Sequence, residues 1–220
     1  MAWNDQEGPM RPTVWYGTAE LIADDFRAGA ADRERDALWW AAEGEPFSEV
    51  LDRAGRARMA NGKRHPHQRR LTRRAIDGCV DALSAISGDL EKATRFHEVF
   101  DLVQKAFKPI HGAGELAVYD AADRICERLG HVSEHVIYLH AGARVGARRL
   151  LGGRLPNGDA WGIMYHQVPD SFRVFSTHEI EDILCRYKDD FSLEPEDLRA
   201  KWTAASTAMC GSGKGIQPSC

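Results

Sequence analysis

The stretch that decides the predicted fold is a glycine turn with the helix after it, Pro109-Ile110-His111-Gly112-Ala113-Gly114-Glu115-Leu116-Ala117-Val118-Tyr119-Asp120-Ala121-Ala122-Asp123-Arg124-Ile125. Apolar residues at helical spacing predict one helix before the turn, residues 90–107, and one after it, residues 115–129. Gly112 and Gly114 allow a tight turn because glycine adopts positive φ without a steric penalty. The backbone N–H groups that open the second helix then form a site for a phosphate oxygen. A helix–helix turn that only required glycine is the alternative.

The same helical spacing continues over most of the chain and predicts an all-α fold. We expect a single helical domain at 12–204, with the glycine turn and its two helices at about 95–129, and a flexible tail at 205–220. A further helix is predicted at 136–151. The segment 155–176 is rich in glycine, proline and aromatic residues and is expected to lack regular structure.

The composition excludes several classes of protein. Of the 220 residues, 43% are hydrophobic and 28% charged, which excludes wholesale disorder. No apolar stretch approaches the roughly 18–20 residues of a membrane-spanning helix, so no membrane partner is predicted. The first residues contain no basic region followed by an apolar one, and we therefore expect a cytoplasmic location. The five cysteines are scattered and expected to be reduced, and neither a metal site nor a cofactor is predicted.

The positive charge is concentrated in residues 51–74. This basic segment holds nine Lys and Arg residues and one acidic residue, Asp52, for a net charge of +8, although the whole chain carries −4. Such a separation of charge creates a local positive field that favours a polyanionic partner. Neutralisation by nearby acidic side chains is the alternative. Within the segment, phosphate or nucleic-acid contacts are predicted for Lys63, Arg64, His65, His67, Gln68, Arg69 and Arg70.

The two histidines of the basic segment permit more than one kind of chemistry. His65 and His67 can act as a general acid and base near neutral pH. As metal ligands they have no third ligand nearby in the sequence, which is why no metal site is predicted. A smaller basic block lies at residues 141–154, where Arg144 and Arg148 are also predicted to contact phosphates.

The middle of the chain resembles a known superfamily. The turn Gly112-Ala113-Gly114, the helix after it and the stretch Val136-Ile137-Tyr138-Leu139-His140-Ala141-Gly142-Ala143-Arg144-Val145 are similar to the central part of helix-hairpin-helix DNA glycosylases. The similarity covers residues 105–151. His140 and Arg144 match a His and an Arg in the segment that follows the hairpin in that family. Residues 61–70, 138–144 and 178–188 together also resemble a widespread group of uncharacterised bacterial and phage proteins.

The resemblance implies a glycosylase-like scaffold that binds DNA and acts on a base or a modified base. Two positions depart from the family: Tyr138 stands where the catalytic aspartate is expected, and the hairpin lysine of the lyase-type members has no counterpart. A displaced catalytic set is therefore expected, drawn from His140, Tyr138, Asp120, Asp123 and Glu181.

Three functions remain as alternatives on the sequence. The first is the base-acting enzyme that the resemblance implies, and the second is a DNA-binding protein without catalytic activity. The third is an enzyme for a nucleotide or a phosphorylated small molecule that uses the loop Lys63–Arg70. A steep salt dependence of DNA binding favours the first two over the third. No oligomeric state is predicted.

Overall fold

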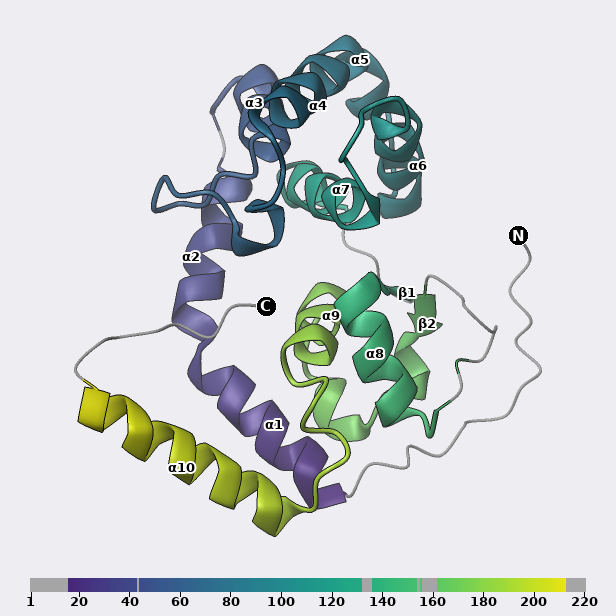
Figure 1. The fold of residues 1–220 in the computed structure, drawn as a ribbon. Coiled ribbons are helices and arrows are strands. Elements are labelled where there is room, and N and C mark those ends of the chain that lie inside the picture. Colours follow the sequence, from purple (N-terminus) through teal and green to yellow (C-terminus); the bar gives the residue numbers. More distant parts are fainter. Residues whose placement is uncertain (1–15, 43, 132–135, 154, 156–161, 213–220) are drawn as a thin grey trace. The chain divides into compact units, whose positions relative to one another are not determined.

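The computed structural model describes residues 16–42, 44–131, 136–153, 155 and 162–212 (Figure 1). These residues are mostly helical, with one small two-stranded sheet. Every helix among them is too short or too polar to cross a membrane. The contacts divide the chain into two compact units. The central unit comprises residues 29–133, and the terminal unit comprises the chain up to residue 28 together with the chain from residue 134 onward.

The central unit is a helical bundle built around α7. Its elements are α2 (Ala30–Trp40), α3 (Phe47–Gly55), the 3-10 turn η1 (Pro66–Gln68), α4 (Arg73–Ala85), α5 (Ser87–Leu90), α6 (Phe96–Phe107) and α7 (Glu115–Leu129). Helix α7 packs against α2, α3, α6 and η1, and α3 also packs against α4. The apolar spacing explains this arrangement, because residues at every third or fourth position of α6, such as Val99, Val103 and Phe107, are buried.

Two features of the sequence fix the start of α4 and its approach to α3. The hydroxyl of Thr72 accepts a hydrogen bond from the backbone N–H of Ala75, which caps the helix. A Cβ added at Gly55 would lie 2.9 Å from the backbone nitrogen of Val80, so only glycine permits the close contact between α3 and α4. Both features fix the ends of the loop at residues 56–72, the part of the basic segment that connects α3 and α4.

The terminal unit combines helices with a short antiparallel sheet. Its elements are α1 (Tyr16–Ala28), β1 (Val136–Tyr138), α8 (Ala141–Leu150), β2 (Gly162–Met164), the 3-10 turns η2 (Tyr165–Gln167) and η3 (Asp170–Phe172), α9 (Thr177–Arg186) and α10 (Pro195–Ser212). Ile137 of β1 is paired with Ile163 of β2, and both are buried. They join a core that includes Phe26 of α1, Leu150 of α8 and Ile183 of α9.

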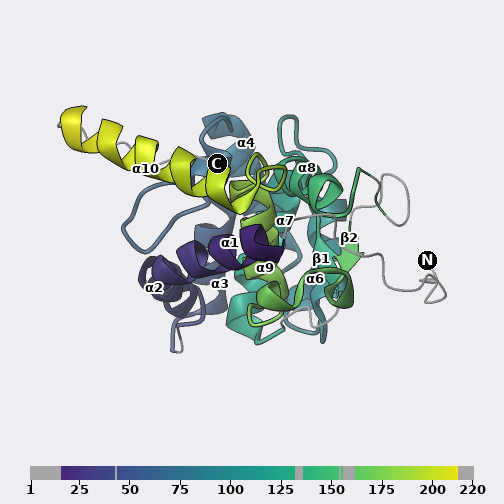
Figure 2. The same ribbon diagram turned by 90° about the horizontal axis from the view of Figure 1, so that it is seen from below.

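Helices α8 and α9 pack closely because α8 carries glycine at its contact face. A Cβ added at Gly146 would lie 1.9 Å from the carbonyl oxygen of Leu184, and one at Gly142 would lie 2.6 Å from Sγ of Cys185. Helix α10 contacts α1, residues 203–207 of α10 are exposed, and the helix extends away from the other helices of the unit (Figure 2). Trp202 attaches α10 to the unit by packing against Tyr187.

The structure confirms the mostly helical character and corrects two details of the expected elements. The single domain at 12–204 stays a prediction; by their contacts, the residues fall into two compact units, since the chain leaves the terminal unit after α1 and returns to it at residue 134. The helix predicted at 136–151 begins with a strand, because its β-branched and aromatic residues pair with β2 in the segment expected to be irregular. The tail predicted from residue 205 is helical as far as Ser212.

Candidate nucleic-acid interface and histidine–aspartate cluster

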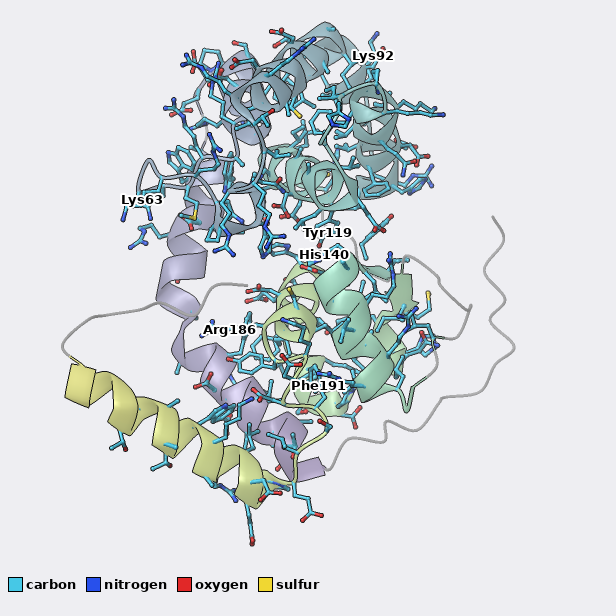
Figure 3. All side chains as sticks on the ribbon, in the orientation of Figure 1. Lys63, Lys92, Tyr119, His140, Arg186 and Phe191 are labelled. Carbon is cyan, nitrogen blue, oxygen red and sulfur yellow. The ribbon has the colours of Figure 1, made fainter. Side chains whose placement is uncertain are left out.

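The basic segment forms a short hairpin after α3. The backbone N–H of His65 donates to the carbonyl oxygen of Ala57 at 2.7 Å, which closes the hairpin. Arg58 and Arg64 face each other in an antiparallel bridge. The hairpin carries Lys63 on the outside of the central unit (Figure 3). The turn chemistry of the sequence, Asn-Gly at 61–62, favours this conformation because Gly62 adopts a φ of +75°.

Most of the positive charge of this segment faces solvent without a carboxylate partner. Arg53 pairs with Glu45, while Arg56 and Arg73 share Asp77. Within the part of the chain that the structure describes, the other six basic side chains are exposed and form no ion pair: Arg58, Lys63, Arg64, Arg69, Arg70 and Arg74. Neutralisation by acidic neighbours therefore accounts for a minority of the segment's charge.

Gln68 fixes the basic segment to α7. Its side chain is 4% exposed, and its Nε2 donates to Oδ2 of Asp120 at 2.8 Å and to the carbonyl oxygen of Leu116 at 3.3 Å. The sequence predicted a nucleic-acid contact for Gln68, but its amide is directed into the unit. Gln68 is therefore a positioning residue that holds η1, and the arginines after it, against the first half of α7.

The carboxylate of Asp120 also lies close to two histidines, His65 and His67. Oδ1 of Asp120 lies 3.6 Å from Nδ1 of His67, and Oδ2 lies 3.8 Å from Nδ1 of His65. Nη2 of Arg124 donates to the same Oδ2 of Asp120 at 3.2 Å, and the Arg124 guanidinium lies over the ring of Trp40. The side chains of Asp120 and His67 are 8% and 11% exposed, whereas that of His65 is 31% exposed. The cluster is thus anchored in the unit and opens to solvent at His65.

The charges around Asp120 keep it ionised. Burial disfavours the charged form, but the Arg124 guanidinium, followed by His67 and His65, outweighs burial and holds the pKa of Asp120 well below its usual range. A buried, ionised carboxylate next to two imidazoles has two chemical uses. It can orient a histidine that accepts or donates a proton, and it can complete a set of metal ligands.

The glycine turn lies beside the start of α4. Gly112 has a φ of +94°, and a Cβ there would lie 3.9 Å from Cβ of Ala75 in the first turn of α4. Gly114 has an extended backbone and precedes α7 without a side-chain cap. The α6–α7 turn, with exposed Gly112 and Gly114, therefore adjoins the helix that begins with Arg73 and Arg74. We use the term basic face for residues 58–74 together with this turn.

A second histidine–carboxylate pair lies in the terminal unit. His140 precedes α8 and pairs through Nε2 with Oε1 of Glu181 on α9, and both side chains are 3% exposed or less. Burial raises the pKa of Glu181, and the contact with His140 opposes this shift. Tyr138, at the end of β1, is buried as well. The two side chains of this pair are therefore buried, in contrast to the partly exposed His65 of the central unit. Figure 3 labels His140.

The remaining predicted residues occupy less distinctive positions. Asp123 is half-buried on α7, one turn from the cluster around Asp120. Arg144 and Arg148 are half-buried on α8, and Nη2 of Arg144 donates to the carbonyl oxygen of Leu139 at 2.8 Å. Arg154, the last cation of the smaller basic block, lies outside the described residues. The predicted carboxylate partners thus divide into Asp120 with His67 and Glu181 with His140.

Neither the ion pair of Arg124 with Asp120 nor the hydrogen bond between Gln68 and Asp120 was predicted from the sequence. Asp120 is separated from His65 and His67 by more than 50 residues, and no local spacing connects them. One signal was present: Asp120 and Arg124 are four residues apart on a predicted helix, a spacing that favours an ion pair.

Comparison of the chain with protein-family models, curated proteins and solved structures finds no match. The interpretation of the site therefore depends on its own chemistry and charge.

Proposed function

We propose that this protein binds nucleic acid, with DNA as the expected partner, through phosphate contacts of the basic face. The observation that carries the proposal is the set of six exposed cations without an ion pair, held on a segment that Gln68 anchors to α7. Arg58 and Arg64 add a second argument, since like charges directly opposite each other in a bridge repel. A phosphate near both guanidinium groups would relieve that repulsion.

The number of exposed cations sets the expected salt dependence. If all six contact phosphates of a duplex, the logarithm of the binding constant falls with the logarithm of salt concentration with a slope of about −5. Raising the salt from 50 to 200 mM would then weaken binding on the order of 1,000-fold. A partner with a single phosphate group would show a much smaller slope.

Fluorescence anisotropy with a short labelled duplex, and with its single strand, tests the proposal. The double variant Arg69→Ala/Arg70→Ala is expected to reduce the slope by about 2. The matched control is Lys92→Ala/Lys105→Ala, which removes two exposed positive charges from the same unit outside the basic face. Lys92 lies far from Lys63 in the central unit (Figure 3). Equal losses in the two variants, or no binding at low salt, would contradict the proposal.

Gly114 allows a separate test of the glycine turn. Its backbone is extended, and no atom lies within 4 Å of a Cβ added there, so Gly114→Val should fold normally. If the turn contacts a phosphate through backbone N–H groups, the valine side chain obstructs that approach and weakens DNA binding. Unchanged binding at an unchanged melting temperature would restrict the interface to the cations of residues 58–74.

We propose in addition that the scaffold is glycosylase-like and acts on a base. The support is the order α6, glycine turn and α7, the match of His140 and Arg144, and a histidine–aspartate cluster that adjoins the basic face and is partly open to solvent. His67 would transfer the proton, oriented by Asp120. Oligonucleotides containing modified bases, analysed by mass spectrometry after incubation, test this second proposal. Turnover by the wild type and none by His67→Gln is expected, and turnover by both would contradict it.

A further inference from the structure

We propose that His65, His67 and Asp120 bind one divalent transition-metal ion of the zinc class. Each residue offers one ligand atom, and the three atoms lie within 4.8 Å of one another. The proposal concerns the central unit alone and does not depend on nucleic-acid binding. It is an alternative to proton transfer by His67, because an imidazole nitrogen that binds a metal ion carries no proton.

The spacing of the three groups is close to that of a zinc site. Tetrahedral coordination at about 2.0–2.1 Å places neighbouring ligand atoms about 3.3 Å apart. Oδ1 of Asp120 and Nδ1 of His67 are 3.6 Å apart, so these two need almost no movement. His65 is the most exposed of the three, and its Nδ1 lies 3.8 Å from Oδ2 of Asp120. The same Nδ1 accepts a long hydrogen bond of 3.4 Å from the backbone N–H of His67 at the start of η1, and an ion would have to replace this bond. Three protein ligands leave a fourth position for water or a phosphate oxygen.

The groups behind Asp120 have the arrangement that supports a metal ligand. Gln68 and Arg124 both donate to Oδ2, so Oδ1 is the oxygen that faces His67. Ligating carboxylates are typically oriented by such outer hydrogen bonds. The Arg124 guanidinium is itself fixed over the Trp40 ring and contacts Oδ2, whereas His67 contacts Oδ1. Its charge opposes a cation but does not occupy the oxygen that would bind one.

The donor set determines the class of ion. Two imidazole nitrogens and one carboxylate oxygen suit Zn²⁺, Fe²⁺, Co²⁺ or Ni²⁺. Ca²⁺ and Mg²⁺ prefer oxygen ligands throughout, and the cluster offers too few. Zn²⁺ and Co²⁺ are therefore the probes, and Mg²⁺ serves as the negative comparison.

Titration of the chelator-treated, untagged full chain tests the site. Calorimetry with Zn²⁺, and visible absorption with Co²⁺, should give one ion per chain in the wild type and no saturation with Mg²⁺. His67→Gln should weaken Zn²⁺ binding at least about tenfold, the lower end of losses seen for groups that only support a ligand. His65→Gln is the second variant, since its exposed position makes misfolding less of a concern. The matched controls are His97→Gln and His111→Gln, two exposed histidines of the same unit.

The outcomes separate cleanly. Loss of one bound ion in His65→Gln and His67→Gln, with retention in His97→Gln and His111→Gln, supports the site. Absence of Zn²⁺ binding to the wild type, or equal binding by all four variants, overturns it. If the anisotropy experiment is repeated with the chelator-treated protein, its result does not depend on a bound ion, and failure of the metal site can be distinguished from failure of DNA binding.

Discussion

Asp120→Asn is the perturbation that tests the central cluster most directly. The side chains of Asp120 and Arg124 are both buried, with 8% and 7% exposed, and Oδ2 of Asp120 lies 3.2 Å from Nη2 of Arg124. Removing one charge of a buried pair leaves the other without compensation and costs about 3–5 kcal/mol. The asparagine oxygen still accepts from Gln68, so we expect a value near the lower end, about 3 kcal/mol. This is a large part of the about 5–15 kcal/mol that stabilises a typical domain.

Urea unfolding followed by far-ultraviolet circular dichroism measures this loss. With a slope of about 1–3 kcal/mol per molar urea, the midpoint should fall by about 1–3 M. The matched control is Asp123→Asn on the same helix, which removes the same charge from a half-buried position and should cost less than about 1 kcal/mol. Equal losses for the two variants would refute the reasoning, because burial and the contact with Arg124 distinguish Asp120 from Asp123.

The pH dependence of the stability loss gives a second, independent test of the role of Asp120. The pKa of Asp120 is lowered in the folded protein, so its contribution is fully present above the unfolded pKa of about 3.9. It is lost as the pH falls below that value toward the folded pKa. The difference in stability between the wild type and Asp120→Asn should therefore shrink as the pH falls below about 4. Between neutral pH and about pH 5, protonation of His65 and His67 beside the carboxylate should increase the difference, because these charges also favour ionised Asp120. A difference that stays undiminished well below about pH 4 would contradict the assignment.

Three further predictions address packing, loop position and thiol reactivity. Gly146→Ala should destabilise the terminal unit by about 3 kcal/mol or more in urea unfolding, because its Cβ would collide with the carbonyl oxygen of Leu184, whereas Gly88→Ala has open space and should be nearly neutral. Gln68→Ala retains every cation and should leave the salt slope of DNA binding unchanged while lowering affinity; a changed slope would argue against a purely positioning role. Cys79 should react slowly with iodoacetamide at pH 8, since burial raises its pKa to about 11; rapid labelling in the folded protein, followed by mass spectrometry, would contradict this.

The helical character of the chain could be predicted from the sequence because its main determinant is local. The spacing of Val99, Val103 and Phe107 and the stop signals after some helices, such as Pro109 after α6 and Gly130 after α7, act within a few residues. The strand at Val136–Tyr138 could not be predicted in the same way, because its partner, Gly162–Met164, lies far along the chain in a stretch without clear periodicity. The division into two units is also nonlocal, since α1 belongs with segments that follow residue 134.

The candidate site shows the same limit. The concentration of cations in residues 51–74 is visible in the sequence, and so is the glycine turn. The two features lie next to each other because of contacts between residues that are distant in the sequence. Gly112 lies near Ala75, and Gln68 donates a hydrogen bond to Asp120. The exposure of the side chains in the basic segment could not be predicted either. Gln68 is buried and its neighbours Arg69 and Arg70 are exposed, and the sequence does not distinguish them in this respect.

Asp120 connects the two proposals physically without making either depend on the other. Its Oδ2 accepts from Gln68, which positions the exposed arginines, and its Oδ1 faces His67, which belongs to the proposed metal site. A change at Asp120 should therefore disturb both DNA affinity and metal binding. Gln68→Ala should chiefly lower DNA affinity, because it removes the hydrogen bond that positions the arginines. His65→Gln should chiefly weaken Zn²⁺ binding, because it removes one proposed ligand. If an ion at Oδ1 tightens the hold of Asp120 on Gln68, Zn²⁺ should raise DNA affinity in the wild type and not in Gln68→Ala.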